Sequence, residues 1–147
     1  MTKIAFLMDP IETVAIKKDS TLAMIRAAQM RGMDVYYCRQ EDLVISDNRV
    51  FAYLSRLALV SHLAEALDPA SVNNGEDSWF TLASEELMPL STMDIVMMRK
   101  DPPFDMEYIY TTYLLERAES EGVRVVNRPG SLRDCNEKLF ATAFPEC

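Results

Sequence analysis

Residues 3–10 read KIAFLMDP, a short and nearly continuous apolar run that ends at Asp9-Pro10. Strands of this kind are buried on both faces, as in parallel sheets. Asp19-Ser20 then supplies helix-capping residues, good helix formers follow, and Gly32 stands where that helix should end. A second apolar run, Val35–Cys38, completes a predicted strand–helix–strand unit.

The same order of elements returns in the second half of the chain. Ile95–Met98 is a predicted strand, and Asp105 can cap a helix over Met106–Glu121 that ends at Gly122. Val123–Val126 is the next predicted strand. Strands that alternate with helices indicate an α/β fold, in which a mostly parallel sheet carries helices on both faces.

The segment between the two units gives weaker signals. Two short apolar runs, Leu43–Ile45 and Val50–Tyr53, flank the polar residues 46–49 and predict a hairpin. Leu57–Leu67 is expected to form a helix, and the Asn- and Gly-containing residues 68–77 an exposed loop.

A last helix is expected near the C-terminal end. It would begin at Ser131, which starts a capping-box-like sequence, and end at Pro145. One face of this helix would be apolar and is formed by Leu132, Cys135, Leu139 and Phe140.

Composition restricts the class of protein. The chain has 147 residues, of which 49% are hydrophobic, enough for one domain with a core. Its net charge of −8 argues against a nucleic-acid partner, because phosphates would be repelled. No apolar run approaches the ~18–20 residues of a membrane helix, and the first residues lack the features of a signal peptide. We therefore expect a cytoplasmic protein without a membrane partner.

Common cofactor and metal motifs are absent from the sequence. Cys38, Cys135 and Cys147 are odd in number and far apart, and His62 is the single histidine. A disulfide framework or a zinc site would need even or clustered spacing. The four glycines are scattered, so there is neither a P-loop nor a dinucleotide fingerprint. We expect reduced thiols and no metal ligands in this chain.

Basic residues gather in the three segments that follow predicted strands, 9–20, 99–105 and 127–138. These segments hold seven of the fifteen basic residues of the chain: Lys17, Lys18, Arg99, Lys100, Arg128, Arg133 and Lys138. Ligands of open α/β sheets bind at the carboxyl ends of strands, so this rim is expected to bind an anion, either a carboxylate or a phosphate. A merely solvated rim is the alternative. Pro102-Pro103 favours binding, because a rigid loop loses less entropy on ligation.

Five motifs resemble bacterial glutathione synthetases in order and in spacing. They are MDPI at 8–11, IKKDS at 16–20, MRKDPPFD at 98–105, LERAE at 115–119 and SLRDCNEKLF at 131–140. The resemblance covers the chain except for roughly residues 44–92, which look longer and more divergent. It implies an ATP-grasp ligase, an enzyme that joins glycine to γ-glutamylcysteine and splits ATP to ADP and phosphate through an acyl phosphate.

The resemblance also implies how the chain is divided. Residues 1–128 would be the N-terminal α/β domain, called the pre-ATP-grasp domain, and 129–147 the first helix of the ATP-grasp part. Lys138 matches the family's first ATP-contacting lysine. The second ATP lysine, the Gly-rich loop and the Mg²⁺-binding acidic cluster are expected further along, as are the catalytic residues. The chain alone is therefore expected to be inactive.

The expected substrate-binding residues lie in the motifs at the strand ends. They are Asp9, Ile11, Lys18, Asp19, Ser20, Arg99, Lys100 and Asp101. The implied partners are γ-glutamylcysteine, glycine, ATP with Mg²⁺, other copies in a homo-oligomer (a tetramer by the resemblance), and the remaining C-terminal part, in the same polypeptide or as a separate chain.

Two other functions stay open at this point. One is a different ATP-grasp carboxylate–amine ligase, although no Gly-Gly pair follows the first strand as a D-alanine ligase would require. The other is a non-catalytic α/β module that binds small anions or mediates assembly.

Overall fold

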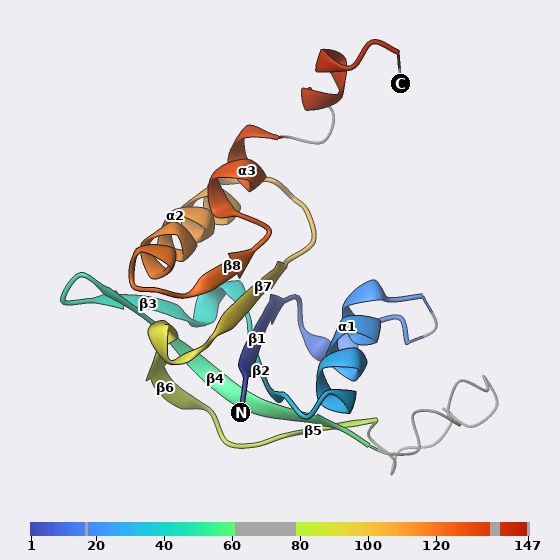
Figure 1. Ribbon diagram of the computed structural model, residues 1–147, viewed down its shortest axis with the longest axis vertical. Helices are drawn as coiled ribbons and strands as arrows, with labels where there is room; N and C mark the ends of the chain where they lie inside the picture. The colour runs from blue at the N-terminus through green and yellow to red at the C-terminus, as the bar shows by residue number, and fades with distance from the viewer. Residues whose placement is uncertain (17, 61–78, 136–138, 147) are drawn as a thin grey trace.

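The computed structural model in Figure 1 describes residues 1–16, 18–60, 79–135 and 139–146. It has the expected α/β fold, with an eight-stranded mixed sheet and helices packed against it. The strands are β1 (Lys3–Met8), β2 (Asp34–Cys38), β3 (Leu43–Ser46), β4 (Arg49–Leu59), β5 (Phe80–Leu82), β6 (Glu86–Pro89), β7 (Ile95–Arg99) and β8 (Arg124–Val126). The α-helices are α1 (Ser20–Met30), α2 (Met106–Ser120) and α3 (Pro129–Asp134). Short 3-10 helices span Ile11–Thr13, Gln40–Asp42, Leu90–Thr92 and Phe140–Ala143.

The centre of the sheet is parallel. Its strands lie in the order β2-β1-β7-β8, and Ile4 of β1 is level with Val35 of β2 and with Ile95 of β7. The four strands predicted from apolar runs are therefore confirmed as neighbours. Because β1 lies between β2 and β7, the loops after β1 and β7 emerge side by side at one edge of the sheet.

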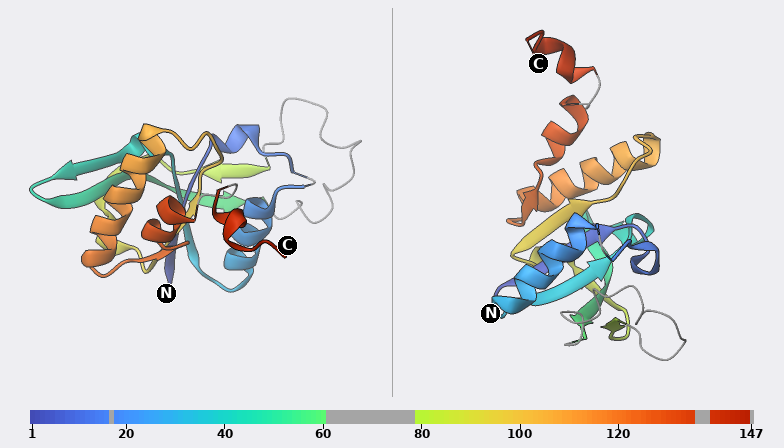
Figure 2. Two further views of the ribbon diagram at one scale, coloured as in Figure 1. Left: turned by 90° about the horizontal axis from the view of Figure 1, so that it is seen from above. Right: turned by 90° about the vertical axis from the view of Figure 1, so that its right-hand side faces the viewer.

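Helices cover both faces of this parallel part, as predicted. Ile4, Phe6 and Met8 lie in the core on the side of α1, while Ala5 and Leu7 lie in the core on the side of α2. Successive residues of a strand point to opposite faces, so an unbroken apolar run is what a strand between two helical layers needs. Figure 2 shows α1 and α2 on opposite sides of the strands.

The predicted helix ends are confirmed at both long helices. The Asp19 carboxylate accepts the N–H of Leu22 at 2.8 Å at the start of α1, and Asp105 accepts the N–H of Tyr108 at 2.9 Å at the start of α2. Gly32 and Gly122 follow the two helices with φ of 70° and 104°, a conformation that costs a glycine little.

The second part of the sheet is antiparallel and makes the sheet mixed. Strand β4 pairs antiparallel with β2, β3, β5 and β6. The predicted hairpin is confirmed as β3 and β4, with Ser46 opposite Arg49. Asp47 and Asn48 form its two-residue turn with φ of 48° and 61°, the primed geometry that matches the twist of paired strands.

Two helix predictions are wrong in the described residues. Residues 57–59 continue strand β4, because Leu57 pairs with Leu82 and Leu59 with Phe80 across β5; residues 61–67 of that predicted helix lie outside the described residues. Strand pairing here outweighs local helix propensity.

The predicted helix from Ser131 to Pro145 is interrupted. The helix that follows β8, α3, starts at Pro129, before the predicted first residue Ser131, and ends at Asp134. Cys135, expected in the apolar stripe, is exposed with φ −94° and ψ 52°, outside the helical region. Leu139 and Phe140, expected on the same face, are 75% and 43% exposed. Leu132 of this face packs against the core on the side of α2, whereas the other three residues are exposed, so packing supports α3 but not a continuous helix beyond it.

No helix among the described residues is long and apolar enough to cross a membrane.

Candidate functional site

Asp9, Lys100 and Asp101 meet at the carboxyl edge of the parallel strands. One oxygen of the Asp9 carboxylate lies 2.8 Å from Lys100 Nζ, and the other accepts the backbone N–H of Asp101 at 2.9 Å. Lys100 Nζ also donates to the carbonyl of Asp101 at 2.8 Å. Asp9 follows β1 and Lys100 follows β7, so this cluster fastens together the two loops that the sheet places side by side.

Arg99, the last residue of β7, reaches across to the first turn of α1. Its Nε donates to Thr21 Oγ1 at 3.0 Å and its Nη2 to Ser20 Oγ at 2.8 Å. Among the described residues no carboxylate forms an ion pair with Arg99. The guanidinium is therefore held by two neutral hydroxyls beside the positive end of a helix dipole, which favours an anion nearby. Within the described residues, the other N–H groups of the five that an arginine carries have no hydrogen-bond partner.

Two of the predicted site residues have structural partners. Asp19 caps α1 and so supports the turn that holds Arg99. Ile11 is fully buried, and its backbone N–H donates to the hydroxyl of Tyr37 at 3.3 Å. The pKa of Tyr37 is raised to about 12, because burial raises it more than this hydrogen bond lowers it. The hydroxyl therefore stays neutral at physiological pH. Lys18 is exposed and directly precedes Asp19.

The other predicted cations divide into three groups. Arg133 is turned onto α2, where it lies 2.7 Å from Glu116, donates to Thr112 Oγ1 at 3.2 Å and stacks over the ring of Tyr113 at 4.3 Å. Arg128 is exposed. Lys17 and Lys138 lie outside the described residues, and so does the predicted ATP contact that Lys138 carries. Among the described cations of the rim, Lys100 and Arg133 are each paired with a carboxylate, whereas Arg99 is not.

Sequence reasoning missed Thr21 and Tyr37, which the structure adds to this edge. Thr21 is buried and binds Arg99, and Tyr37 binds the backbone of the loop after β1. Thr21 stands directly after the quoted IKKDS motif, and that position is the one signal by which it could have been found. In the sequence, nothing distinguishes Tyr37 from the other residues of its predicted apolar strand.

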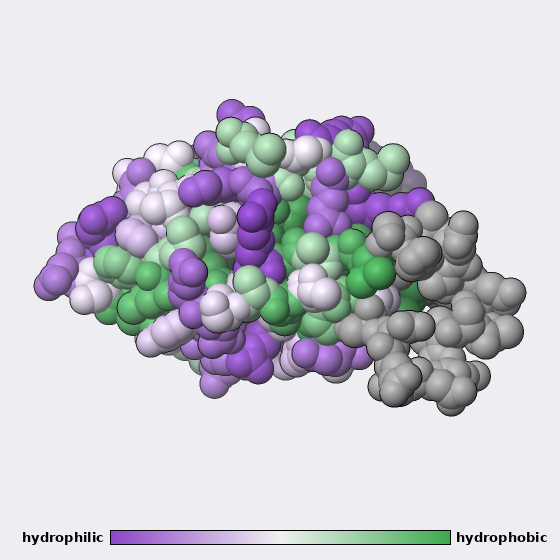
Figure 3. All heavy atoms as spheres, turned by 90° about the horizontal axis from the view of Figure 1, so that it is seen from below, coloured by the Kyte–Doolittle hydropathy of each residue, from purple (hydrophilic) through white to green (hydrophobic). Residues whose placement is uncertain are grey.

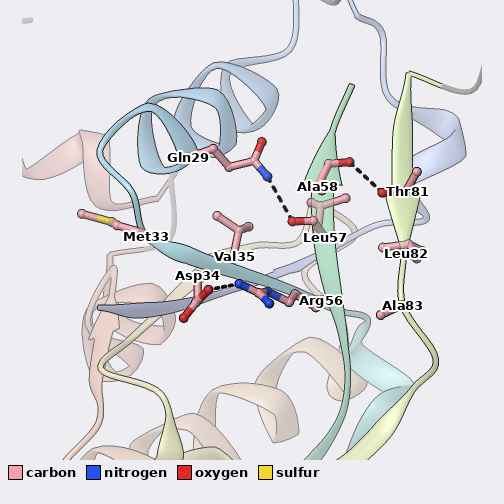
Figure 4. A pocket seen from close by; sticks show the side chains of 10 residues that line it. All are labelled: Gln29, Met33, Asp34, Val35, Arg56, Leu57, Ala58, Thr81, Leu82 and Ala83. Atoms are coloured by element: carbon pink, nitrogen blue, oxygen red, sulfur yellow. Dashed lines mark hydrogen bonds and ion pairs between the residues drawn. The ribbon is translucent and has the colours of Figure 1, made fainter. Parts of the chain in front are cut away.

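A cavity of about 410 Å³ lies elsewhere, where β2 begins (Figure 4). The side chain of Gln29 points toward β4 there and donates to the carbonyl of Leu57 at 3.1 Å. The two charged side chains of its lining, Asp34 and Arg56, are paired with each other. A cavity whose charges are already paired offers no charge for an ionic ligand, so it does not compete with the Arg99 edge as an anion site.

A second cavity, of about 350 Å³, lies between α2 and the 3-10 helix after β2. Glu41 and Glu107 line it together with Tyr110 and Leu114. Carboxylates in the lining would repel an anion. In the described part of the chain, no group of His, Cys, Asp and Glu side chains could hold a metal ion.

Comparison with known proteins identifies relatives along nearly the whole chain. The family described as "Prokaryotic glutathione synthetase, N-terminal domain" matches residues 2–133. Similar proteins named glutathione synthetase come from Pseudomonas putida, with 49% identity over 145 residues, Pseudomonas syringae pv. tomato, with 50% over 145 residues, and Vibrio cholerae, with 49% over 146 residues. Each match covers 99% of this chain but 41–42% of the relative. The chain therefore spans about two fifths of the length of these curated relatives.

Proposed function

Because the chain belongs to the prokaryotic glutathione synthetase family, as its N-terminal domain, we propose that the intact protein joins glycine to γ-glutamylcysteine at the expense of ATP. The cysteinyl carboxylate of the dipeptide attacks the γ-phosphate, which gives an acyl phosphate and ADP. The amine of glycine then attacks the acyl carbon, phosphate leaves, and a proton is released from the new amide. The names of the relatives support this reaction.

ATP and Mg²⁺ belong to the same proposal. Mg²⁺ would neutralise charge on the transferred phosphoryl group. The described residues hold no group of three His, Cys, Asp or Glu side chains that could bind a metal ion. We assign the magnesium ligands, and the catalytic residues, to the part of the longer relatives that this chain does not span. Lys138 remains our candidate for an ATP contact, and residue 129 for the start of the ATP-grasp part. A cytoplasmic homo-oligomer is also proposed.

In this scheme, Arg99 binds a carboxylate of γ-glutamylcysteine. One observation carries the assignment: two neutral hydroxyls hold its guanidinium, and no described carboxylate neutralises it. An arginine that served only the fold would be expected to pair with an acid, as Arg133 does with Glu116. Held in place before the substrate arrives, the guanidinium loses little entropy on binding and can orient the dipeptide for reaction.

Asp9 and Lys100 are positioning residues in the same scheme. Lys100 is already neutralised by Asp9, so the pair offers little net charge to a substrate. By joining the loops after β1 and β7, it fixes where Arg99 leaves the end of its strand. Ser20 and Asp19 act in the same way from α1, the first by binding Arg99 directly and the second by capping the helix.

The test is steady-state kinetics on Arg99→Ala in the intact protein. The Michaelis constant for γ-glutamylcysteine should rise roughly ten- to a hundred-fold, as expected for the loss of a charge-assisted hydrogen bond of ~1.5–3 kcal/mol. The constants for ATP and glycine should stay unchanged. Arg124→Ala is the matched control, because Arg124 is an exposed arginine at the opposite end of the sheet.

A thermal melt beside the kinetics separates binding from folding. Unchanged Michaelis constants together with a lower melting temperature would assign Arg99 to the fold alone. Lys138→Ala should act mainly on the Michaelis constant for ATP. A panel of other carboxylate and amine substrates distinguishes the proposed ligase from other ATP-grasp ligases.

A further inference from the structure

Three side chains of α2 converge on Arg133 of α3. Arg133 Nη2 lies 2.7 Å from Glu116 Oε2, and Nη1 donates to Thr112 Oγ1 at 3.2 Å. The guanidinium carbon lies 4.3 Å from the centre of the Tyr113 ring. A planar group that is bound at two of its edges and on one face loses a contact when it turns. Arg133 therefore fixes the orientation of α3 on α2 as well as its position.

The α2 side of this contact is firmly placed. Thr112 is fully buried and donates its own proton to the carbonyl of Ile109 at 2.6 Å, so its oxygen accepts the proton of Arg133 through a lone pair. The side chain of Arg133 is 18% exposed, which limits the competition of water for these contacts. Leu132, the preceding residue, packs against the core on the side of α2. One apolar and one polar side chain thus join α3 to the domain.

Helix α3 depends on these contacts because it is short. It has six residues, whereas isolated helices below ~12–15 residues are marginal in water. Pro129 is buried, and the other five residues are half-buried or exposed. The apolar residues gathered on the face seen from below in Figure 3 lie at the end of the molecule away from α3 in Figure 1, so they do not hold it.

Beyond α3 the chain leaves the α/β domain. Cys135 is exposed, and Leu139, Phe140 and Phe144 are 75%, 43% and 49% exposed. Figure 1 shows residues 139–146 beyond α3, away from the sheet. The matched relatives are more than twice as long as this chain, which covers 41–42% of them. On the proposed function, the part that binds ATP begins with α3, so the orientation of α3 decides where that part starts.

We propose that Arg133 is a positioning residue for the ligase reaction. By fixing α3 on α2, it sets how the ATP-binding part lies relative to the dipeptide at the Arg99 edge. Arg133 itself binds no substrate, because its charge is paired with Glu116. This inference rests on the proposed function, in which the two reacting substrates are held on either side of α3. Their alignment matters for rate, since a misplacement of about 1 Å can cost on the order of a hundred-fold.

The test is steady-state kinetics on Arg133→Ala in the intact protein. The kcat should fall roughly ten- to a hundred-fold, as expected for misaligned substrates. The Michaelis constants for γ-glutamylcysteine and ATP should each change by less than about twofold, because every substrate keeps its own contacts. A loss of stability alone would not produce this separation of kcat from the Michaelis constants at a temperature where a thermal melt shows the variant to be folded.

Arg117→Ala is the matched control. Arg117 also lies on α2, where its Nε donates to the carbonyl of Asn48 at 3.0 Å and lies 3.8 Å from Glu121. It joins α2 to the β3–β4 hairpin, so both of its partners belong to the α/β domain. Its removal should lower the melting temperature and leave kcat unchanged.

Arg133→Lys separates charge from geometry. A lysine keeps a charge for Glu116 but lacks the planar fork that also binds Thr112 and faces Tyr113. It should therefore recover melting temperature more than kcat. An unchanged kcat in folded Arg133→Ala, a full recovery of kcat by lysine, or an effect confined to the Michaelis constant for γ-glutamylcysteine would each overturn the assignment.

Hydrogen exchange tests the contact without relying on activity. The backbone N–H groups of Leu132 and Cys135 donate within α3. In Arg133→Ala they should exchange at least about tenfold faster, because the helix opens more often, and in Arg117→Ala they should not. Unchanged exchange would show that Leu132 holds α3 without Arg133. A wild type that makes no glutathione would instead contradict the proposed function, and the exchange rates would still decide whether Arg133 holds α3.

Discussion

Asp9 Oδ1 lies 2.8 Å from Lys100 Nζ, and this ion pair joins the loop after β1 to the loop after β7. The same carboxylate accepts the backbone N–H of Asp101. The Asp9 side chain therefore binds both the ammonium group of Lys100 and the backbone of the next residue. Residues far apart in sequence are joined because parallel strands bring their carboxyl ends to one edge. Arg99, opposite Met8 in the sheet and next to Lys100 in the chain, lies at the same edge.

Removing either partner should destabilise the protein and show that the two act together. Asp9→Ala and Lys100→Ala should each lower the free energy of unfolding by ~1–2 kcal/mol, because both side chains are half-buried and the acid also binds a backbone N–H. The double variant should lose less than the sum, as measured by urea unfolding in a double-mutant cycle.

The Arg39–Glu41 pair is the control for that cycle. Its side chains are 39% and 63% exposed, and exposed pairs contribute at most ~1 kcal/mol. Strict additivity of Asp9→Ala and Lys100→Ala would show that the joint between the loops has no energetic role.

The two helix caps permit a matched comparison of stability with function. Asp19→Ala and Asp105→Ala should each cost ~1 kcal/mol of unfolding free energy, the usual loss for an N-cap carboxylate. In the intact protein, only Asp19→Ala should raise the Michaelis constant for γ-glutamylcysteine, because α1 carries the hydroxyls that hold Arg99. Equal effects of the two substitutions on that constant would contradict the role assigned to the first turn of α1.

Tyr37 should make the protein sensitive to alkali. Its pKa is raised by burial from 10.0 to about 12, so the unfolded chain loses this proton at a lower pH than the folded one. The stabilisation is fully present below pH 10 and is lost as the pH rises toward 12. Urea midpoints between pH 9 and 12 should therefore fall more steeply for the wild type than for Tyr37→Phe.

The same substitution has a separate cost at neutral pH. Tyr37→Phe leaves the buried N–H of Ile11 without its partner, which should cost ~1–3 kcal/mol of unfolding free energy. Identical pH profiles for the wild type and Tyr37→Phe would show that another group governs the alkaline transition.

Local sequence determined much of the fold. The apolar run of β1, the Asp19 and Asp105 caps and the Asp47–Asn48 turn each act through neighbours within a few residues, so their patterns predict structure directly. The strand at residues 57–59 escaped prediction because pairing with β5 outweighs local propensity. The helix predicted from Ser131 is interrupted because its exposed apolar residues lack packing that would extend it past α3.

The sequence by itself determined that β1, β2, β7 and β8 are strands of one α/β domain, and that cations would gather at their carboxyl ends. Only the tertiary structure decided which of the described cations are paired with a carboxylate. Arg99 is held by Ser20 and Thr21, whereas Lys100 is neutralised by Asp9 and Arg133 by Glu116. An ion pair depends on the distance between two side chains, and that distance is set by strand order and helix packing rather than by separation along the chain.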